Sequence, residues 1–145
     1  MIKGVHHTAF STPDMDRALH FYCELLGAQK LSDGRWGPGN EPINRVLGLP
    51  DTGGRSAMLK LGNLHLELWQ FETPKPPARE ARPPASNLGL AHICLEVDDV
   101  DAEYDRLRNA GIQFHTEPGT FGNRRATYGR DPDGNIFEIL QELNH

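Results

Sequence analysis

Apolar and polar residues follow two different periods along the chain. Alternation with a period of two predicts strands. The alternating segments are about 28–31, 56–61, 64–71, 113–116, 125–130 and 136–140, besides short ones around His7 and His92. Residues 14–26 and 99–110 instead carry apolar side chains at helical spacing and end at Gly27 and Gly111, which predicts two helices.

The first half of the sequence resembles the second half. The same shift along the chain carries His7 onto His92 and Asp14 onto Asp99. Each histidine lies in a strand-like segment, and each aspartate stands where it can cap the helix that follows. Each half has the order strand, helix and three further strands. The chain is therefore predicted to be an α+β protein of two tandem βαβββ modules.

Two segments interrupt the repeat. Residues 72–88 contain several prolines, which exclude a helix and predict an extended linker. We therefore expect a single domain over 1–145, with module 1 at about 1–71 and module 2 at about 89–145. Residues 33–54 are rich in glycine and proline around a short predicted helix, and they form either a functional lid or pocket wall or a surface insertion.

Size, charge and cysteine content narrow the class of protein. A chain of 145 residues has the length of one soluble domain, and no apolar run is long enough to cross a membrane. Fifteen Lys and Arg against 20 Asp and Glu give a net charge of -5, which argues against nucleic acid as a partner. The start lacks the apolar region of a secretory signal, so we expect a cytoplasmic protein. Cys23 and Cys94 are too few for a disulfide framework or a thiolate metal site, which leaves histidines and carboxylates to build any chemistry.

Two glutamates stand in otherwise apolar strands. Glu67 lies between two leucines, and Glu138 lies between Phe137 and Ile139. A carboxylate in such a strand costs free energy unless it is paired or bound to a metal ion. Taken singly, each has an ordinary explanation as a side chain that faces solvent, and a strand histidine is usually a hydrogen-bonded residue.

The repeat changes this interpretation, because each half contributes one histidine and one glutamate. A pseudo-twofold arrangement would bring His7, Glu67, His92 and Glu138 together inside a cupped mixed sheet. Two neutral imidazoles and two carboxylates carry a charge that a divalent ion neutralises. Nitrogen and oxygen ligands suit Zn, Ni, Co, Mn or Fe, so one divalent metal ion per site is predicted.

These motifs resemble the vicinal oxygen chelate superfamily. The resemblance rests on His7 and His92 with the aspartates that follow them, on Glu67 within Leu-Glu-Leu, and on the Asp-Pro-Asp-Gly-Asn-Ile-Phe-Glu sequence of 131–138. That superfamily includes glyoxalase I, methylmalonyl-CoA epimerase, extradiol dioxygenases and fosfomycin- or bleomycin-resistance proteins. The resemblance implies paired modules around a metal ion held by His7, Glu67, His92 and Glu138, and it suggests a homodimer.

The resemblance also implies a small-molecule substrate with vicinal oxygens. In the lyase and epimerase branches a metal-stabilised enolate or enediolate forms while a carboxylate moves the proton next to a carbonyl. Glu67 or Glu138 would be that catalytic carboxylate, and Glu41 in the 33–54 segment is a further candidate. Ser11 stands where glyoxalase I proteins commonly have an arginine, which argues against a glutathione substrate, and the segment from His92 looks closer to methylmalonyl-CoA epimerase.

Further residues are candidates for substrate binding. Trp69 shares a strand face with Glu67 and would shape the pocket. His65 on that face would relay protons or contact substrate, unless it only supports a ligand by hydrogen bonding. Arg124, Arg125, Tyr128 and Arg130 would bind an anionic group, unless the arginines pair with nearby acids.

Two other functions stay open. An Fe(II) extradiol-type ring-cleavage dioxygenase would use His7, His92 and Glu138, but Glu67 would then occupy a position that catechol or dioxygen requires. An antibiotic-sequestering resistance protein without a metal would not need all four ligands.

Overall fold

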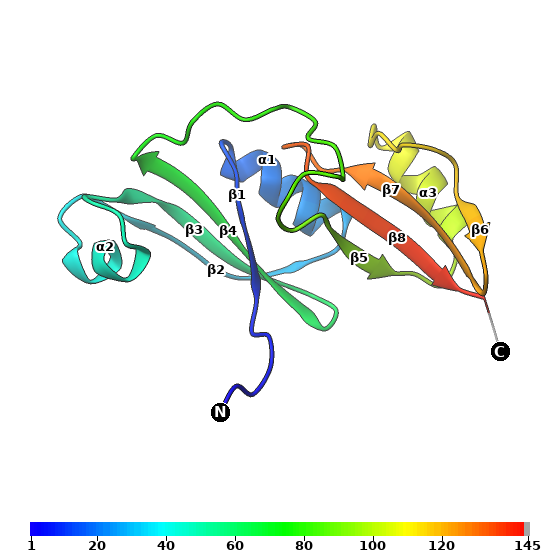
Figure 1. Cartoon of the computed structure of the whole chain (residues 1–145), viewed down its shortest axis with the longest axis horizontal. Helices are drawn as coiled ribbons and strands as arrows, with labels where there is room; N and C mark the ends of the chain where they lie inside the picture. Colours follow the sequence, from blue (N-terminus) through cyan, green and yellow to red (C-terminus); the bar gives the residue numbers. More distant parts are fainter. Residues whose placement is uncertain (144–145) are drawn as a thin grey trace. The chain divides into compact units, whose positions relative to one another are not determined.

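The computed structural model describes residues 1–143. It divides into two compact units, module 1 over residues 1–79 and module 2 from Glu80 onward. Each module is a four-stranded mixed sheet with a helix after its first strand (Figure 1). The predicted α+β fold of two βαβββ modules is confirmed.

Module 1 has the sheet order β1-β4-β3-β2. Strands β1 and β4 are parallel, and the other neighbours are antiparallel. Its elements are β1 (Thr8–Ser11), α1 (Met15–Leu19), the π-helix η1 (His20–Leu25), β2 (Gln29–Trp36), α2 (Glu41–Leu47), β3 (Gly53–Leu61) and β4 (Leu64–Thr73).

Module 2 has the equivalent sheet order β5-β8-β7-β6, again with one parallel pair, β5 and β8. Its elements are β5 (His92–Glu96), α3 (Val100–Asn109), β6 (Gly119–Phe121), β7 (Arg124–Arg130) and β8 (Ile136–Glu142).

The two helices begin in the same way, which is the structural basis of the sequence repeat. Asp14 is the N-cap of α1 and Asp99 is the N-cap of α3, and each side chain accepts a hydrogen bond from a backbone N–H in the first turn. A glutamine from the last strand of each module accepts a hydrogen bond from the backbone N–H of the first residue of the helix. Gln70 accepts from Met15, and Gln141 accepts from Val100. Each helix start is therefore fixed to the strand that carries the predicted glutamate.

The apolar side chains of each last strand form the core with that helix. Leu66 and Leu68 are fully buried in module 1, as are Phe137 and Ile139 in module 2. Because side chains alternate along a strand, the residues between them lie on the other face of each sheet. We call this second face, which the module's own helix does not cover, the open face.

The prediction of a strand at 113–116 is wrong. This segment forms only an isolated bridge between Phe114 and Gly129, and the edge strand is β6, which lies later in the chain. The apolar ring of Phe114 packs against Tyr104 and Phe137. Phe114 is therefore apolar because its ring packs in the core, and not because residues 113–116 form a strand.

The first half also differs from prediction at three places. His7 precedes β1 instead of lying within it, and the second part of the helix predicted at 14–26 winds as a π-helix. Strand β2 continues to Trp36 and pairs with β3, so the ends of the 33–54 segment extend a hairpin. Leu31 is the extra residue of a bulge in β2, because Lys30 pairs with Leu59 and Ser32 with Met58.

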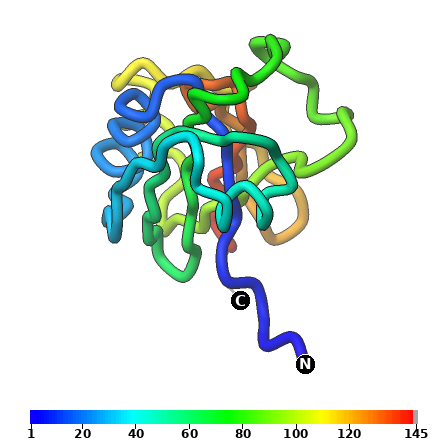
Figure 2. Tube along the Cα trace, turned by 90° about the vertical axis from the view of Figure 1, so that its left-hand side faces the viewer, coloured from blue at the N-terminus to red at the C-terminus, as the bar shows by residue number. Residues whose placement is uncertain are grey.

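The segment that joins β4 to β5 covers residues 74–91 and not 72–88, because β4 runs to Thr73 and β5 begins only at His92. Its later part belongs to module 2, where Arg130 donates hydrogen bonds to the carbonyls of Pro83 and Gly134. At the other end, residues 1–7 extend away from the start of β1 and are exposed (Figure 2).

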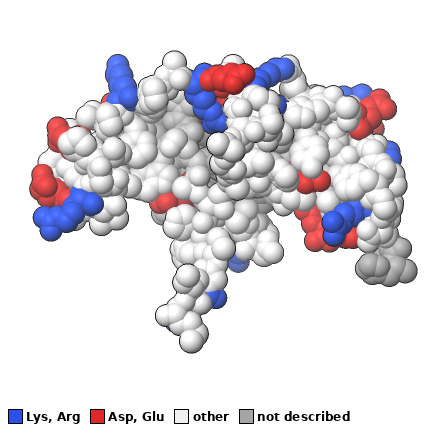
Figure 3. All heavy atoms as spheres, viewed as in Figure 1, with Lys and Arg blue, Asp and Glu red and all other residues white. Residues whose placement is uncertain are grey.

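Charges of both signs are mixed on the surface. On the face shown in Figure 3, Lys and Arg lie beside Asp and Glu. Within residues 1–143, none of the helices has the length and apolar character needed to cross a membrane.

Candidate metal centre

Each module holds one of the predicted histidine–glutamate pairs on its open face. In module 1 the Nε2 atom of His7 lies 3.2 Å from Oε2 of Glu67. In module 2 the Nε2 atom of His92 lies 3.1 Å from Oε2 of Glu138. In each pair the histidine lies at or just before the start of the module's first strand. The glutamate lies within the module's last strand, which runs parallel to the first strand. The sequence repeat thus corresponds to a repeated arrangement of two side chains.

The pairs fit the geometry of metal ligands. Two ligand atoms about 2.1 Å from one ion and at a right angle to each other lie about 3 Å apart, which is close to both observed distances. An imidazole nitrogen and a carboxylate oxygen also suit the divalent ions predicted above. Within residues 1–143, side chains of His, Cys, Asp and Glu form no group of three or more that could hold a metal ion. Each module therefore presents two candidate ligands.

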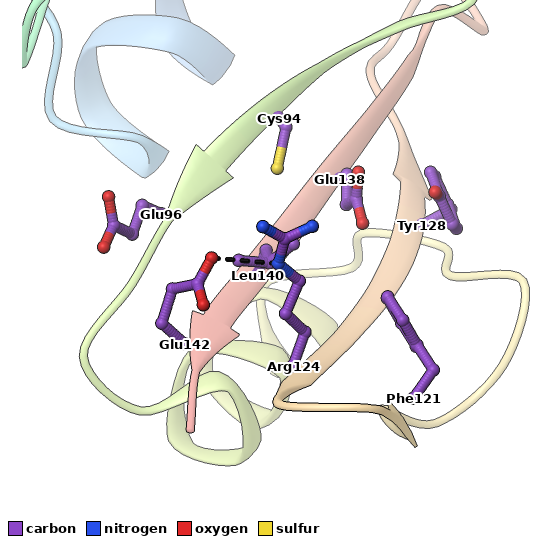
Figure 4. A pocket seen from close by; sticks show the side chains of 8 residues that line it. All are labelled: Cys94, Glu96, Phe121, Arg124, Tyr128, Glu138, Leu140 and Glu142. Carbon is purple, nitrogen blue, oxygen red and sulfur yellow. Dashed lines mark hydrogen bonds and ion pairs between the residues drawn. The ribbon is translucent and has the colours of Figure 1, made fainter. Parts of the chain in front are cut away.

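Glu138 is buried among donors. Only 7% of its side chain is exposed, and its neighbours across the sheet are Cys94 on β5 and Tyr128 on β7 (Figure 4). Burial and the charge of Glu138 raise the pKa of the Cys94 thiol to about 12. Burial, and then the charge of the same carboxylate, raise the pKa of Tyr128 above its ordinary value. The ring of Tyr128 also meets that of His92 edge to face, with centroids 5.2 Å apart.

Glu138, Cys94 and Tyr128 line a pocket of about 580 Å³ on the open face of module 2. Its opposite end is polar, because Arg124 donates a hydrogen bond to Glu142 there (Figure 4). Cys94 lies on the pocket side of its strand, as the alternation predicts. Arg124 was predicted to bind substrate and Cys94 was not among the predicted site residues, although their positions opposite Glu142 and Glu138 follow once the strand pairing is known.

Glu67 has a different environment. Its side chain is 19% exposed, and its neighbours across the sheet are Ala9 and Met58, which donate no hydrogen bond. His65, two residues earlier on the same face, stacks on His6 with ring centroids 5.8 Å apart. The carboxylate of Glu67 is therefore held by His7 while that of Glu138 has additional partners.

Two of the predicted arginines, Arg125 and Arg130, form hydrogen bonds outside the pocket. Arg125 lies on the helix-covered face of module 2, where its guanidinium donates to Asp101 of α3. Arg55 makes the equivalent contact with Asp16 in module 1, so the pair belongs to the repeated scaffold. Arg130 holds the joining segment, as described above. Of the four candidates on this strand, Arg124 lines the pocket but is bound to Glu142, and only Tyr128 lies opposite Glu138.

The remaining candidates lie in module 1. Glu41 is exposed in the first turn of α2. Trp69 lies on the open face two residues from Glu67 and contacts Trp36 and Phe71. Sequence reasoning missed Trp36 because the glycine- and proline-rich composition around it hid the continuation of β2.

The fold is that of a known superfamily, and comparison with known proteins identifies it. The model of the Glyoxalase/Bleomycin resistance protein/Dioxygenase superfamily matches residues 4–139. The chain therefore belongs to this superfamily, as its sequence motifs predict.

Similar proteins include two epimerases and a lyase. The chain is 33% identical to 2-epi-5-epi-valiolone epimerase from an Actinomyces species, over 94% of this chain and 78% of the relative. It is 32% identical to ethylmalonyl-CoA/methylmalonyl-CoA epimerase of Cereibacter sphaeroides, over 78% and 75% of the two chains. It is 27% identical to a probable lactoylglutathione lyase of Synechocystis, over 93% and 92%.

Solved structures show the same fold. A glyoxalase family protein from Bacillus cereus superposes with a TM-score of 0.89 and 24% identity, covering 99% of this chain and 97% of that one. The fosfomycin resistance protein FosX of Listeria monocytogenes, crystallised with Mn(II) and sulfate, gives a TM-score of 0.65 and 16% identity, covering 97% and 93%.

Proposed function

We propose that this protein is a divalent-metal-dependent isomerase or lyase that transfers a proton at the carbon next to a carbonyl. The observation that carries the proposal is the repeated pair, His7 with Glu67 and His92 with Glu138, at distances that suit ligands of one ion. The superfamily and its epimerase and lyase members support this class of reaction.

The two pairs together hold one ion in this proposal. When bound, a divalent ion supplies positive charge that stabilises the oxyanion developing on the substrate. His7 and His92 bind as neutral imidazoles through Nε2. Glu138 is the fixed carboxylate, because Tyr128 and Cys94 restrain it in a buried position.

Glu67 is the proton-transferring group. A general base must move between its resting partner and the substrate proton, and Glu67, whose resting partner is His7, is the more exposed of the two carboxylates. Its Oε2 atom accepts the proton from the carbon next to the carbonyl and returns it to that carbon or its neighbour. Return to the adjacent carbon gives an isomerised product. Return to the same carbon gives an epimer when the intermediate turns its opposite face toward Glu67 before the proton is delivered.

Metal content and proton exchange test the proposal. Protein purified without added ions should contain one divalent ion for each set of two pairs, and His7→Ala and His92→Ala should each lose all of it. Loss of half the metal in each variant would show two independent sites and contradict a shared ion. Proton–deuterium exchange, followed by NMR over a panel of 2-oxoaldehyde adducts, thioesters and 2-hydroxyketones, should occur next to the carbonyl of one class. A protein that holds metal but exchanges no proton in any class would overturn the reaction.

A further inference from the structure

We infer that three aromatic side chains of module 1 form a binding surface for a ring-shaped substrate. Trp36, Trp69 and Phe71 make up this aromatic corner, which lies on the open face next to Glu67. The inference rests on the proposed function, which it extends by naming the substrate class: a six-membered ring that carries hydroxyl groups and a carbonyl.

The three rings have a fixed mutual geometry. Trp69 and Phe71 are nearly parallel, with an interplanar angle of 10° and centroids 5.6 Å apart. Trp36 stands almost perpendicular to both, at 79° and 88°. Phe71 therefore stacks on one face of Trp69, and Trp36 meets both rings edge to face, which leaves the other face of Trp69 for contact with the C–H face of another ring.

Trp36 reaches the other two rings because β3 has a glycine between them. Gly54 pairs with Trp36 on one side and with Phe71 on the other. A Cβ atom at position 54 would lie 2.8 Å from the Trp36 ring and 2.2 Å from the carbonyl oxygen of Gln70. The absence of a side chain there lets the indole lie over the strand.

The segment that carries α2 holds Trp36 in place. The indole N–H donates to Oγ1 of Thr52 at 3.0 Å. Thr52 is completely buried, and its hydroxyl and its backbone N–H both donate to the side-chain oxygen of Asn44 in α2. This buried network fixes the orientation of a half-buried indole. It gives the 33–54 segment a role as a wall of the binding surface, one of the two roles that its sequence left open.

The position of the corner relates it to the chemistry. Trp69 follows Glu67 by two residues on the same strand face, a separation of about 7 Å between Cα atoms. A six-membered ring stacked on Trp69 would therefore bring its edge toward Glu67 and His7. The hydroxyl of Ser56, which pairs with Trp69 across the sheet, is available to ring hydroxyl groups.

Charge around the corner disfavours a phosphate-rich ligand. Arg35, next to Trp36, donates to Glu72 at 2.6 Å. Arg55 of β3 lies on the helix-covered face and donates to Asp33 and Asp16. The corner therefore presents ring faces and a hydroxyl group, while both of these guanidinium groups are already bound by carboxylates.

Tryptophan fluorescence tests the inference directly, because the chain has only two tryptophans and both belong to the corner. Titration of the purified protein with scyllo-inosose, a six-membered polyhydroxy ketone, should quench the emission saturably. Dihydroxyacetone, which has the same carbonyl and hydroxyl groups without a ring, should bind at least tenfold more weakly. No saturable quenching by the inosose, or equal affinity for both probes, would overturn the inference.

Three variants locate the binding. Trp69→Leu should weaken inosose affinity about tenfold, with Trp36 still reporting, whereas Trp69→Phe should keep it within about threefold because a ring remains. Phe121→Leu removes an exposed aromatic side chain from the pocket of module 2 and should leave the affinity unchanged. Circular dichroism spectra and melting curves establish that each variant is folded. Wild-type affinity in folded Trp69→Leu would place the ring elsewhere and contradict the inference.

The two proposals fail in distinguishable ways. Glu67→Gln should lose proton exchange and still show quenching by the inosose. Ring binding without any exchange in the wild-type protein would leave the corner standing and remove the proposed reaction. Proton exchange with acyclic substrates, without fluorescence quenching by the inosose, would leave the proposed reaction standing and remove the aromatic corner as a binding surface.

Discussion

The two modules share a scaffold but differ around their glutamates. In both, an aspartate and a glutamine fix the helix start, an arginine joins strand to helix, and a histidine lies beside a glutamate. On the open faces the corresponding positions have diverged. Module 2 has Tyr128 and Cys94 beside Glu138, where module 1 has Met58 and Ala9 beside Glu67.

The difference continues along the last strand of each module. Beyond Glu67, strand β4 carries Trp69 and Phe71, whereas beyond Glu138 strand β8 carries Leu140 and Glu142, the latter bound to Arg124. Identical histidine–glutamate pairs are therefore set in unlike surroundings. Module 2 buries its carboxylate beside polar side chains, whereas module 1 leaves its carboxylate more exposed beside apolar ones.

The largest effect is expected from Glu138→Gln. It should abolish metal retention and reduce proton exchange by about 10³-fold or more, because the buried ligand loses its charge. Elemental analysis and NMR exchange rates measure both. Glu142→Gln, on the same strand and in the same pocket, serves as the control and should keep its metal. Full activity in Glu138→Gln would refute the site.

Glu67→Gln should separate the two carboxylates. The amide oxygen can still face the ion but cannot accept a proton, so we expect bound metal to persist while exchange falls by about 10²- to 10⁴-fold. The same two measurements apply. If Glu67→Gln instead loses metal as completely as Glu138→Gln, the assignment of different tasks to the two modules is wrong.

Tyr128→Phe should weaken the metal site without removing a ligand. The variant lacks the phenol hydroxyl of the side chain next to Glu138 in the pocket, so the metal dissociation constant should rise about 10- to 100-fold. Competition with a chelator measures it. Met58→Leu changes the equivalent position beside Glu67 and should have little effect. Equal changes in the two variants would mean that both glutamates are held alike.

The smallest effect concerns stability in acid. Hydrogen bonds from Arg55, then from Lys30, hold the pKa of Asp33 well below its usual range in the folded state. Unfolded chains protonate this group near pH 4, so its contribution is present above that pH and is lost as the pH falls toward the folded pKa.

Asp33→Asn should accordingly lower Tm at neutral pH by about 2–4 °C, the equivalent of about 1 kcal/mol, and have a smaller effect below about pH 3. Asp101→Asn breaks the more exposed pair with Arg125 in module 2 and should shift Tm less. Melting curves across pH provide the comparison. A pH-independent difference for Asp33→Asn would exclude the ionic origin.

The sequence predicted most of what depends on local periodicity. Helix starts at Asp14 and Asp99 follow from capping, and the strands that carry Glu67 and Glu138 follow from alternation. Alternation along β7 would also have predicted that Arg125 and Tyr128 lie on opposite faces of the sheet, because successive side chains of a strand point to opposite faces.

What could not be predicted depends on contacts distant in sequence. The alternating segment at 113–116 looks like a strand, but its phenylalanine fills a core position made by residues from two other elements. Trp36 becomes part of a site only because Gly54 and Thr52, far along the chain, leave room for it and hold it. No local pattern encodes such a pairing.

The bulge at Leu31 has a consequence for folding fidelity. It sets the phase of β2 so that Trp36 faces the open side while Asp33 faces Arg55 on the helix side. A slip of one residue in this edge strand would exchange the two faces, placing the indole toward the helix and separating the carboxylate from its guanidinium. The misaligned hairpin would therefore lose contacts on both faces of the sheet. The single extra residue at Leu31 thus favours the native register.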